Sequence, residues 1–453
     1  MKRFGWNALI MNQHCNTASK FIPVRKILPR VDRWPASLLG VDRKSPITIS
    51  VLLIFFAIPS ICAAGGPVDG SKASAMGTAF AAVADDPSAI YFNPAGLTQL
   101  QGTNIYSGGS FIIPSSKYIS PSGKSEKTDF QLFAAPHLYA ASDFNTNAMS
   151  FGLGIYSPFG IGGRKWSEEG ITRYISTDNT IATFAINPVI AWKLNPWVSL
   201  GAGFYYEYAT LQAERMMSQA TLGAGDAKFS LKGDGGGWGY NAGILLFPGR
   251  LFSFGLTYRS GSSVEQNMTV SLDNIAPTLR PLFGGSSFNT GASSSIDFPQ
   301  DVTLAIALRP TSKLTFAFDA DRVSWSSLQA INVDVQHQVP QAGVGDIAIP
   351  FDSHDAWQLK AGVEYSVSDK LALRGGYVYT QTYLPDITVN PGNPDSNQYG
   401  VSLGFGYKMG RFTLDSFYLA DFFEPRKVSN DLLSGEYRSF MHLVGSSINF
   451  KWK

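Results

Sequence analysis

Hydrophobic and polar residues alternate along most of the chain from residue 102 onward. Residues 198–209 place apolar and aromatic side chains on one face of an extended segment and mostly small, polar or charged side chains on the other, and residues 314–321, 371–380 and 401–407 repeat the pattern. A period of two is that of a β-strand whose faces meet different surroundings. The pattern predicts fourteen strands, near residues 102–114, 130–141, 147–158, 180–194, 197–215, 237–247, 251–272, 295–309, 313–335, 355–366, 370–381, 397–408, 411–421 and 438–452.

The connections between these strands alternate in length as well. Links after even-numbered strands are short, such as residues 194–196, whereas links after odd-numbered strands are long and polar, such as residues 159–179 and 273–294. A soluble sandwich also has a period of two, but short turns at one rim and long loops at the other are typical of outer-membrane barrels. A closed barrel satisfies its backbone in lipid without leaving an edge. We therefore expect an all-β fold, a 14-stranded antiparallel transmembrane β-barrel over residues 102–453.

An almost wholly apolar stretch at residues 47–61 follows basic residues and leads into small ones. This is the pattern of a secretory signal peptide, with cleavage after Ala64. The stretch is shorter than the roughly twenty residues of a membrane-spanning helix, although an N-terminal anchor helix is the alternative. We expect residues 1–64 to be a leader, with translation starting near Val41.

Removing the leader changes the charge and the available chemistry. Nine of the 36 Lys and Arg residues and two of the 34 Asp and Glu residues lie in the leader, which leaves a net charge of −5. The basic balance of the full chain is therefore no evidence for a nucleic-acid partner. Both cysteines also lie in the leader, and the remaining histidines show no metal-ligand spacing. With neither a G-x-S-x-G turn nor a P-loop, we expect no enzyme, no catalytic residues, no cofactor and no metal.

Residues 65–101 do not alternate, and they include the turn-rich stretch DDPSAIYFNPAGL at residues 85–97. This segment resembles the N-terminal hatch of the FadL-type outer-membrane transporters of long-chain fatty acids and hydrocarbons, in which a hatch with an Asn-Pro-Ala motif blocks a fourteen-stranded barrel. The matching segments are Met76–Phe80, Ala84–Asp86 and Asn93–Gly96, and the resemblance continues in Trp238–Leu245, Leu256–Ser260, Ser324–Ser326 and Asp355–Trp357.

The resemblance implies passive transport of hydrophobic small molecules. The ligand is captured among extracellular loops, held in a pocket between the hatch inside the lumen and the barrel wall, and released through a lateral opening in a kinked third strand. The roles implied are hatch and gating for Asp85, Asp86, Asn93, Pro94, Ala95 and Gly96; ligand binding for Met76, Phe80, Ile90, Tyr91, Phe92 and Arg215; and lateral opening for Gly152, Gly154, Pro158 and Gly160.

Each role has a physical reason and a plainer alternative. Arg215 suits a ligand carboxylate because its guanidinium can bind both oxygens. The alternative is that Arg215 is a rim arginine paired with a neighbouring acid. The family's second cation, before the tenth strand, is replaced by Ile349 or Pro350, which leaves room for hydrocarbons. Pro158 removes a ladder donor, or simply ends its strand. The apolar hatch residues either line the pocket or pack the plug against the wall.

We expect a monomeric protein of the bacterial outer membrane. Its partners are hydrophobic small molecules, outer-membrane lipid and lipopolysaccharide, and the barrel-assembly machinery during insertion. The alternatives are a non-transporting barrel that serves as an adhesin or secretion scaffold, an outer-membrane lipase, and a porin for polar solutes, which the hatch disfavours.

Overall fold

The computed structural model describes residues 69–146 and 148–452. The chain divides into two units, residues 1–51 and 52–453, and only the second contains described residues. The predicted leader, its cleavage site and the first residues of the predicted hatch lie outside the described part. Within that part, no helix combines the length and the apolar character needed to cross a bilayer.

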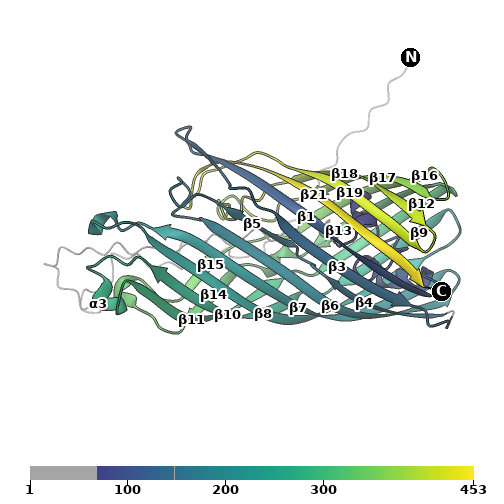
Figure 1. The fold of residues 1–453 in the computed structure, drawn as a ribbon, viewed down its shortest axis with the longest axis horizontal. Helices are drawn as coiled ribbons and strands as arrows, with labels where there is room; N and C mark the ends of the chain where they lie inside the picture. Colours follow the sequence, from purple (N-terminus) through teal and green to yellow (C-terminus); the bar gives the residue numbers. More distant parts are fainter. Residues whose placement is uncertain (1–68, 147, 453) are drawn as a thin grey trace, which may run out of the picture. The chain divides into compact units, whose positions relative to one another are not determined.

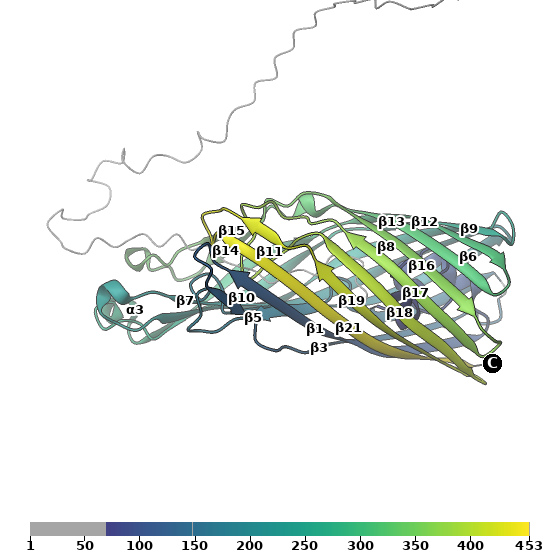
Figure 2. The same cartoon turned by 90° about the horizontal axis from the view of Figure 1, so that it is seen from above.

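Fourteen antiparallel strands close into a barrel (Figures 1 and 2). The first strand pairs with the last along its whole length, from Thr103 opposite Trp452 to Ile119 opposite Glu436, which leaves no free edge. Several strands consist of two segments. In chain order they are β1 (Thr103–Ile119), β3 (Phe133–Ser142), β4 (Met149–Tyr156) with β5 (Ile161–Lys165), β6 (Asp178–Asn195), β7 (Val198–Met217), β8 (Ala227–Leu246), β9 (Phe252–Arg259) with β10 (Ser262–Asp273), β11 (Ser287–Phe298) with β12 (Asp301–Thr311), β13 (Leu314–Val323) with β14 (Ala330–Val335), β16 (Ala356–Ser366), β17 (Leu371–Thr380), β18 (Gln398–Met409), β19 (Phe412–Phe423) and β21 (Gly435–Trp452).

Short elements lie in the long loops, at the end of the barrel opposite the C-terminus (Figure 1), except for a short helix that lies between β13 and β14, η6 (Trp325–Ser327). They include three short strands that pair with the ends of longer ones, and four short helices. These elements are β2 (Ser125–Lys127), β15 (Ile347–Pro350), β20 (Arg426–Val428), α3 (Arg280–Phe283), η5 (Ala220–Leu222), η6 (Trp325–Ser327) and η7 (Pro340–Ala342).

The strand predictions are too short at the long-loop end. The sixth strand begins at Ala227 and not near residue 237, and the eighth begins at Ser287 and not near residue 295. Parts of two predicted loops are therefore strand. The outer faces of these extensions are polar, so they lack the apolar face by which the membrane-spanning parts were recognised.

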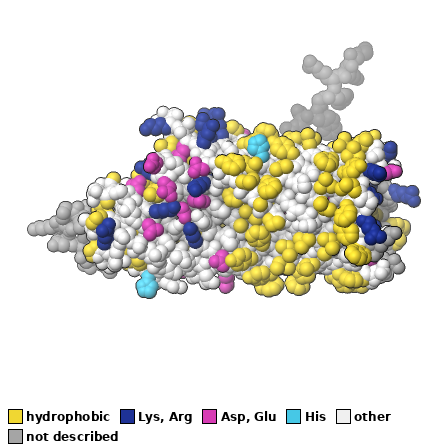
Figure 3. Space-filling model, in the orientation of Figure 1, with side chains coloured by type: hydrophobic (Ala, Val, Ile, Leu, Met, Phe, Trp, Pro, Cys, Tyr) yellow, Lys and Arg dark blue, Asp and Glu magenta, His cyan; other side chains and the backbone are white. Residues whose placement is uncertain are grey.

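Strand β8 shows that the barrel has two zones. Near its end at the short turns its outer face carries Ile244, then an aromatic rim at Trp238, and then polar residues such as Lys232. The polarity of its inner face changes in the opposite sense, from polar at Asn241 to apolar at Phe229. Figure 3 shows the resulting apolar band and, beyond it, a surface of mixed charge. The first zone is the part that faces lipid, and the second extends past the membrane at the extracellular, long-loop side.

Candidate functional site

The N-terminal segment, residues 69–102, folds inside the barrel, and we call it the hatch. It contains two short α-helices and a 3₁₀ helix, α1 (Ser71–Ala75), α2 (Ala89–Phe92) and η4 (Pro94–Gln99), drawn in purple in Figure 1. Asn93 caps η4, because its side-chain oxygen accepts from the amide of Ala95 at 3.1 Å, and Pro94 occupies the first helical turn, where no amide is needed. The same side chain donates to the carbonyls of Ala81 at 2.8 Å and Ile244 at 3.1 Å. One residue thus shapes the turn and ties it to the wall.

Polar side chains of the wall hold the hatch through its backbone. The donors and acceptors come from strands far along the chain, so the hatch is bound on several sides. The anchors are Asp319, which accepts from the amides of Phe80 at 2.8 Å and Ala81 at 2.9 Å; Asn241, which donates to the carbonyl of Ile90 at 2.9 Å; Ser253, which donates to that of Ala82 at 2.6 Å; and Ser402, which accepts from the amide of Gly77 at 3.0 Å.

Glycines of the wall allow the hatch to approach closely. A Cβ on Gly243 would lie 2.2 Å from the side-chain oxygen of Asn93, and one on Gly376 would lie 2.0 Å from the amide nitrogen of Gly77. Atoms of the hatch therefore occupy the space that side chains at these two wall positions would need, which is a common reason for glycine within a strand.

The predicted acidic pair separates in the structure. Asp86 is buried and accepts from the amide of Ser88 at 2.8 Å, so it shapes the turn before α2. Asp85 is exposed and pairs with Lys72 at 2.8 Å, and Lys72 also lies 3.6 Å from Glu364 on β16. Lys72 thus links Asp85 to a carboxylate of the wall.

The apolar hatch residues assigned to ligand binding are all buried in one cluster with the third strand. The ring of Tyr91 makes edge contacts with Phe92 and Tyr156, at centroid distances of 4.9 and 5.2 Å. The side chain of Ile90 lies against Gly152 and Gly154, where a Cβ would come within 2.9 Å of it. Met76 and Phe80 belong to the same cluster, whereas Ala95 and Gly96 lie in η4, where a Cβ on Gly96 would meet Ala84.

The third strand is interrupted where proline and glycine were predicted to matter. β4 ends at Tyr156 and β5 begins at Ile161, with Pro158 and Gly160 between them, and Gly160 has a φ of 79°. β5 pairs with β6, and β3 pairs with β4 only from Leu138 to Ser142. The described residues show no ladder between β3 and β5. Strand hydrogen bonding is therefore missing from part of the wall beside the hatch.

Sequence reasoning missed Arg259, which links the hatch to this interruption. Its guanidinium donates to the carbonyl of Tyr91 at 2.8 Å and to the hydroxyl of Tyr156 at 3.0 Å, and it lies 4.2 Å from the centre of the Tyr91 ring. Tyr156 is the last residue of β4. Arg259 is the last residue of β9, and its side chain faces the barrel interior. The sequence could have indicated a role for it, because a buried cation at membrane depth is costly unless it has partners.

Above the hatch, the extracellular half of the barrel has an apolar interior. Along β10 four of the six inward positions are apolar, the exceptions being Ser262 and Gln266, whereas all six outward positions are polar. Sequence reasoning did not identify this lining, although the outward Glu, Asn and Thr residues between Val264 and Leu272 were a visible signal. We call it the lumen cluster; it includes Phe229, Leu231, Met268, Val270, Ile296 and Val333.

Arg215 lies on the wall of the lumen cluster. It is buried, its guanidinium lies 5.9 Å from the ring centre of Phe229, and it donates to the carbonyl of Tyr174 at 3.4 Å. Ile349 is buried within the lumen cluster. A further buried cation that was not predicted, Arg164 on β5, donates to the hydroxyl of Ser116 at 2.8 Å.

Residues 381–397, between β17 and β18, turn inward at the extracellular end, and we call them the in-folded loop. Tyr383 stacks on Trp325 with ring centres 4.4 Å apart, and the carbonyl of Pro391 accepts from the indole of Trp166 at 3.0 Å. Leu384 and Val389 are buried in the lumen cluster. The loop thus packs its apolar side against the lumen lining.

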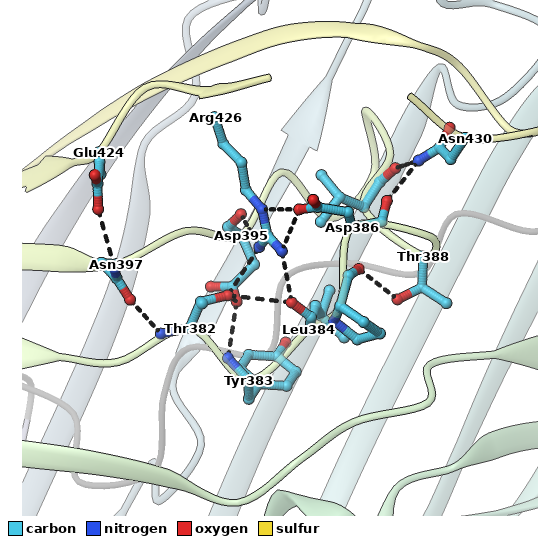
Figure 4. Close-up of polar contacts among 12 residues, drawn as sticks. Thr382, Tyr383, Leu384, Asp386, Thr388, Asp395, Asn397, Glu424, Arg426 and Asn430 are labelled. Carbon is cyan, nitrogen blue, oxygen red and sulfur yellow. Dashed lines mark hydrogen bonds and ion pairs between the residues drawn. The ribbon is translucent and has the colours of Figure 1, made fainter. Parts of the chain in front are cut away.

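Polar contacts from the next hairpin hold this loop in place (Figure 4). Arg426 and Asn430 lie on the far side of β18 and β19 in sequence, so neither was predicted. Arg426 donates to Thr382 Oγ1 at 2.9 Å and to the carbonyls of Leu384 at 2.8 Å and Asp395 at 3.0 Å, and pairs with Asp386 at 2.8 Å; Asn430 donates to the carbonyls of Asp386 and Val389, each at 2.8 Å.

Three hollows of the described structure differ from the lumen cluster in size or in position. One of about 30 Å³ lies between the hatch and charged residues of the wall, and it is too small for a long apolar ligand. Two apolar hollows of about 510 and 710 Å³ are lined by lipid-facing side chains, among them Trp192 and Leu304. These hollows are separate from the lumen cluster.

A family model described as outer membrane protein transport protein (OMPP1/FadL/TodX) matches residues 56–421. The chain belongs to this family. It is accordingly an outer-membrane transporter of hydrophobic compounds and not an enzyme.

Relatives within and beside the family agree over most of the chain. The long-chain fatty acid transport protein of Escherichia coli O6:H1 is 23% identical over 408 residues, which cover 81% of this chain and 89% of the relative. The crystal structure of a Pseudomonas aeruginosa FadL homologue has a TM-score of 0.75 at 19% identity and covers 86% of this chain and 100% of its own. The Pseudomonas putida toluene transporter TodX has a TM-score of 0.68 at 17% identity, covering 84% and 98%. At these identities the solved structures establish the fold.

Proposed function

We propose that the protein carries long-chain fatty acids from the cell exterior through the lumen cluster and into the bilayer beside the third strand. The observation that supports this best is the reversal of polarity along β8 and β10, where the extracellular half of the barrel is polar outside and apolar inside. A channel for polar solutes has the opposite interior. An apolar interior gives a hydrophobic solute a favourable path past the polar surface of the membrane, without any source of energy.

Two features favour an acidic head group on the ligand. Arg215 is a buried guanidinium beside an aromatic ring, and Arg164 lies on the inner side of β5. A guanidinium can bind both oxygens of a carboxylate. Hydrocarbons are the second candidate, because Ile349 stands where the family's other cation is expected and adds to the apolar lining.

Uptake separates the two substrates. In cells that lack their own transporters, we expect expression of this chain to restore uptake of both oleate and hexadecane if the lumen accepts apolar chains generally. Arg215→Gln should lower oleate uptake at least about tenfold, since a hydrogen bond to a charged group contributes about 1.5–3 kcal/mol, and leave hexadecane uptake unchanged. Arg173→Gln is the matched control, because Arg173 is an arginine paired with Asp226 at 3.1 Å. Uptake of neither compound would favour an adhesin or scaffold.

The exit beside the third strand has its own test. A Cβ on Gly162, in β5, would have no heavy atom within 4 Å, so a large side chain there enters open space next to the interruption. We expect Gly162→Trp to block release and reduce uptake of both substrates. Gly249, in a short turn, is equally uncrowded, so Gly249→Trp serves as control. Equal uptake by the two variants would argue against this exit.

A further inference from the structure

The outer face of the barrel carries a row of three cations across β2, β1 and β21. In the antiparallel ladders Lys117 lies directly opposite Lys127 on one side and Arg438 on the other. Alternation along β1 places Lys117 on the same outer face as the exposed Phe111, and the side chain of Arg438 is 56% exposed. Side chains of directly opposed residues are about 5 Å apart, so like charges there repel each other. The row is therefore unfavourable for the barrel by itself.

The barrel supplies little negative charge to this row. Arg438 donates to Glu436 at 2.6 Å, and Glu436 is itself opposite Lys427 in the ladder with β20. The described residues place no carboxylate within 4 Å of Lys117 or Lys127. The row thus keeps a net positive charge.

The nearest acid in sequence is used elsewhere. Glu126 lies beside Lys127, but its carboxylate accepts from the amides of Ser167 at 3.2 Å and Thr172 at 3.0 Å. Its role is to hold the loop after β5, so it does not neutralise the row.

Two other lysines at the same end of the barrel are paired. Lys228 lies 2.8 Å from both Glu168 and Glu214, and Lys232 lies 3.4 Å from Glu214. The contrast shows that this rim neutralises some cations with two acids of its own, whereas among the described residues Lys117 and Lys127 have no carboxylate within 4 Å and Arg438 has only Glu436.

The row lies just beyond the lipid-facing band. Arg438 is two residues beyond Phe440, whose ring contacts those of Phe422 and His442 at 4.9 and 4.5 Å between centroids. Aromatic rims mark the boundary of the hydrocarbon core, and two residues of a strand rise about 7 Å. The cations therefore stand at the level of lipid head groups on the long-loop side, which is the outer leaflet.

We infer that Lys117, Lys127 and Arg438 bind the phosphate groups of a lipopolysaccharide molecule in the outer leaflet. A phosphate supplies the negative charge that the row lacks, at the height where the head group lies, while the acyl chains pack on the apolar band below. Arg438 offers a fork for two phosphate oxygens and the lysines offer compact charges. Binding converts a repulsive row into a neutralised one, so the lipid stabilises this part of the wall.

The test uses the full chain, purified in detergent free of lipopolysaccharide, with native mass spectrometry as the readout. The probes are lipid A with both phosphates, lipid A with its phosphates removed, and inorganic phosphate. We expect the chain to bind bisphosphorylated lipid A about a hundredfold more tightly than the dephosphorylated form, as three cations at a charged surface predict. The triple variant Lys117→Gln, Lys127→Gln, Arg438→Gln should lose this preference, and the control Lys228→Gln, Lys232→Gln should keep it.

Three results would overturn the inference. The first is that the triple variant binds bisphosphorylated lipid A within twofold of the unmodified chain. The second is that the control variant loses as much affinity as the triple variant. The third is that inorganic phosphate binds the unmodified chain as tightly as bisphosphorylated lipid A does. If the triple variant fails to fold, Lys117→Gln alone gives an answer. It removes the central repulsion, so its melting temperature without lipid A should exceed that of the unmodified chain, and added bisphosphorylated lipid A should remove the difference. A melting temperature unchanged in both conditions would count against the site.

Discussion

Replacing Asn93 by alanine tests whether this one side chain holds the hatch closed. Asn93 makes three hydrogen bonds at 2.8, 3.1 and 3.1 Å, to Ala81, Ile244 and Ala95, and it is fully buried. Each bond contributes about 1 kcal/mol net, so the free energy for opening this part of the hatch should fall by about 3 kcal/mol. Since about 1.4 kcal/mol corresponds to a factor of ten, amide exchange should accelerate about a hundredfold.

Hydrogen exchange followed by mass spectrometry measures this directly, on peptides that cover residues 80–97. Peptides from β17 should exchange as before, which would show that the barrel remains folded. Asn267→Ala is the control, because Asn267 is exposed on the outer face of β10. Exchange of the hatch peptides within about threefold of the unmodified chain would refute the view that these three contacts hold the hatch.

Three further changes probe the hatch and the in-folded loop. Gly243→Ala places a Cβ 2.2 Å from the side-chain oxygen of Asn93, so it should shift the hatch and speed exchange of the same peptides, whereas Gly249→Ala should not; equal exchange in both would contradict the close packing. Arg426→Gln removes the pair with Asp386 and weakens three other contacts, so limited proteolysis should cut residues 381–397 at least about tenfold faster; unchanged cutting would show that the apolar contacts suffice. Burial raises the pKa of the Asp395 carboxyl above its usual 3.8, so the folded loop binds this proton more tightly than the released loop. Proteolysis of the loop should therefore be slowest below pH 3.8 and become faster as the pH rises through the raised pKa. Asp395→Asn should abolish this pH dependence.

The barrel was predictable because its signals are local. A period of two follows from strand geometry, and the alternation of short and long connections follows from the difference between the two sides of an outer membrane. The turn at Asn93 and Pro94 is likewise set by neighbouring backbone, and the structure has Asn93 capping the helix that Pro94 begins. The ends of β8 and β11 were misplaced because their outer faces meet water, where an apolar face is not required.

The sequence by itself determined the barrel, the turn-rich hatch and the band that faces lipid. The tertiary structure alone decided which side chains hold the hatch and the in-folded loop. Asp319 meets Phe80 across 239 residues of chain, and Arg426 meets Thr382 across 44. Their partners are backbone amides, carbonyls and a hydroxyl. Such groups occur throughout the chain, so the sequence does not indicate which of them will bind a charged side chain from a distant segment. The closed barrel brings these groups to one place, and burial then makes each polar group depend on the partner it finds there.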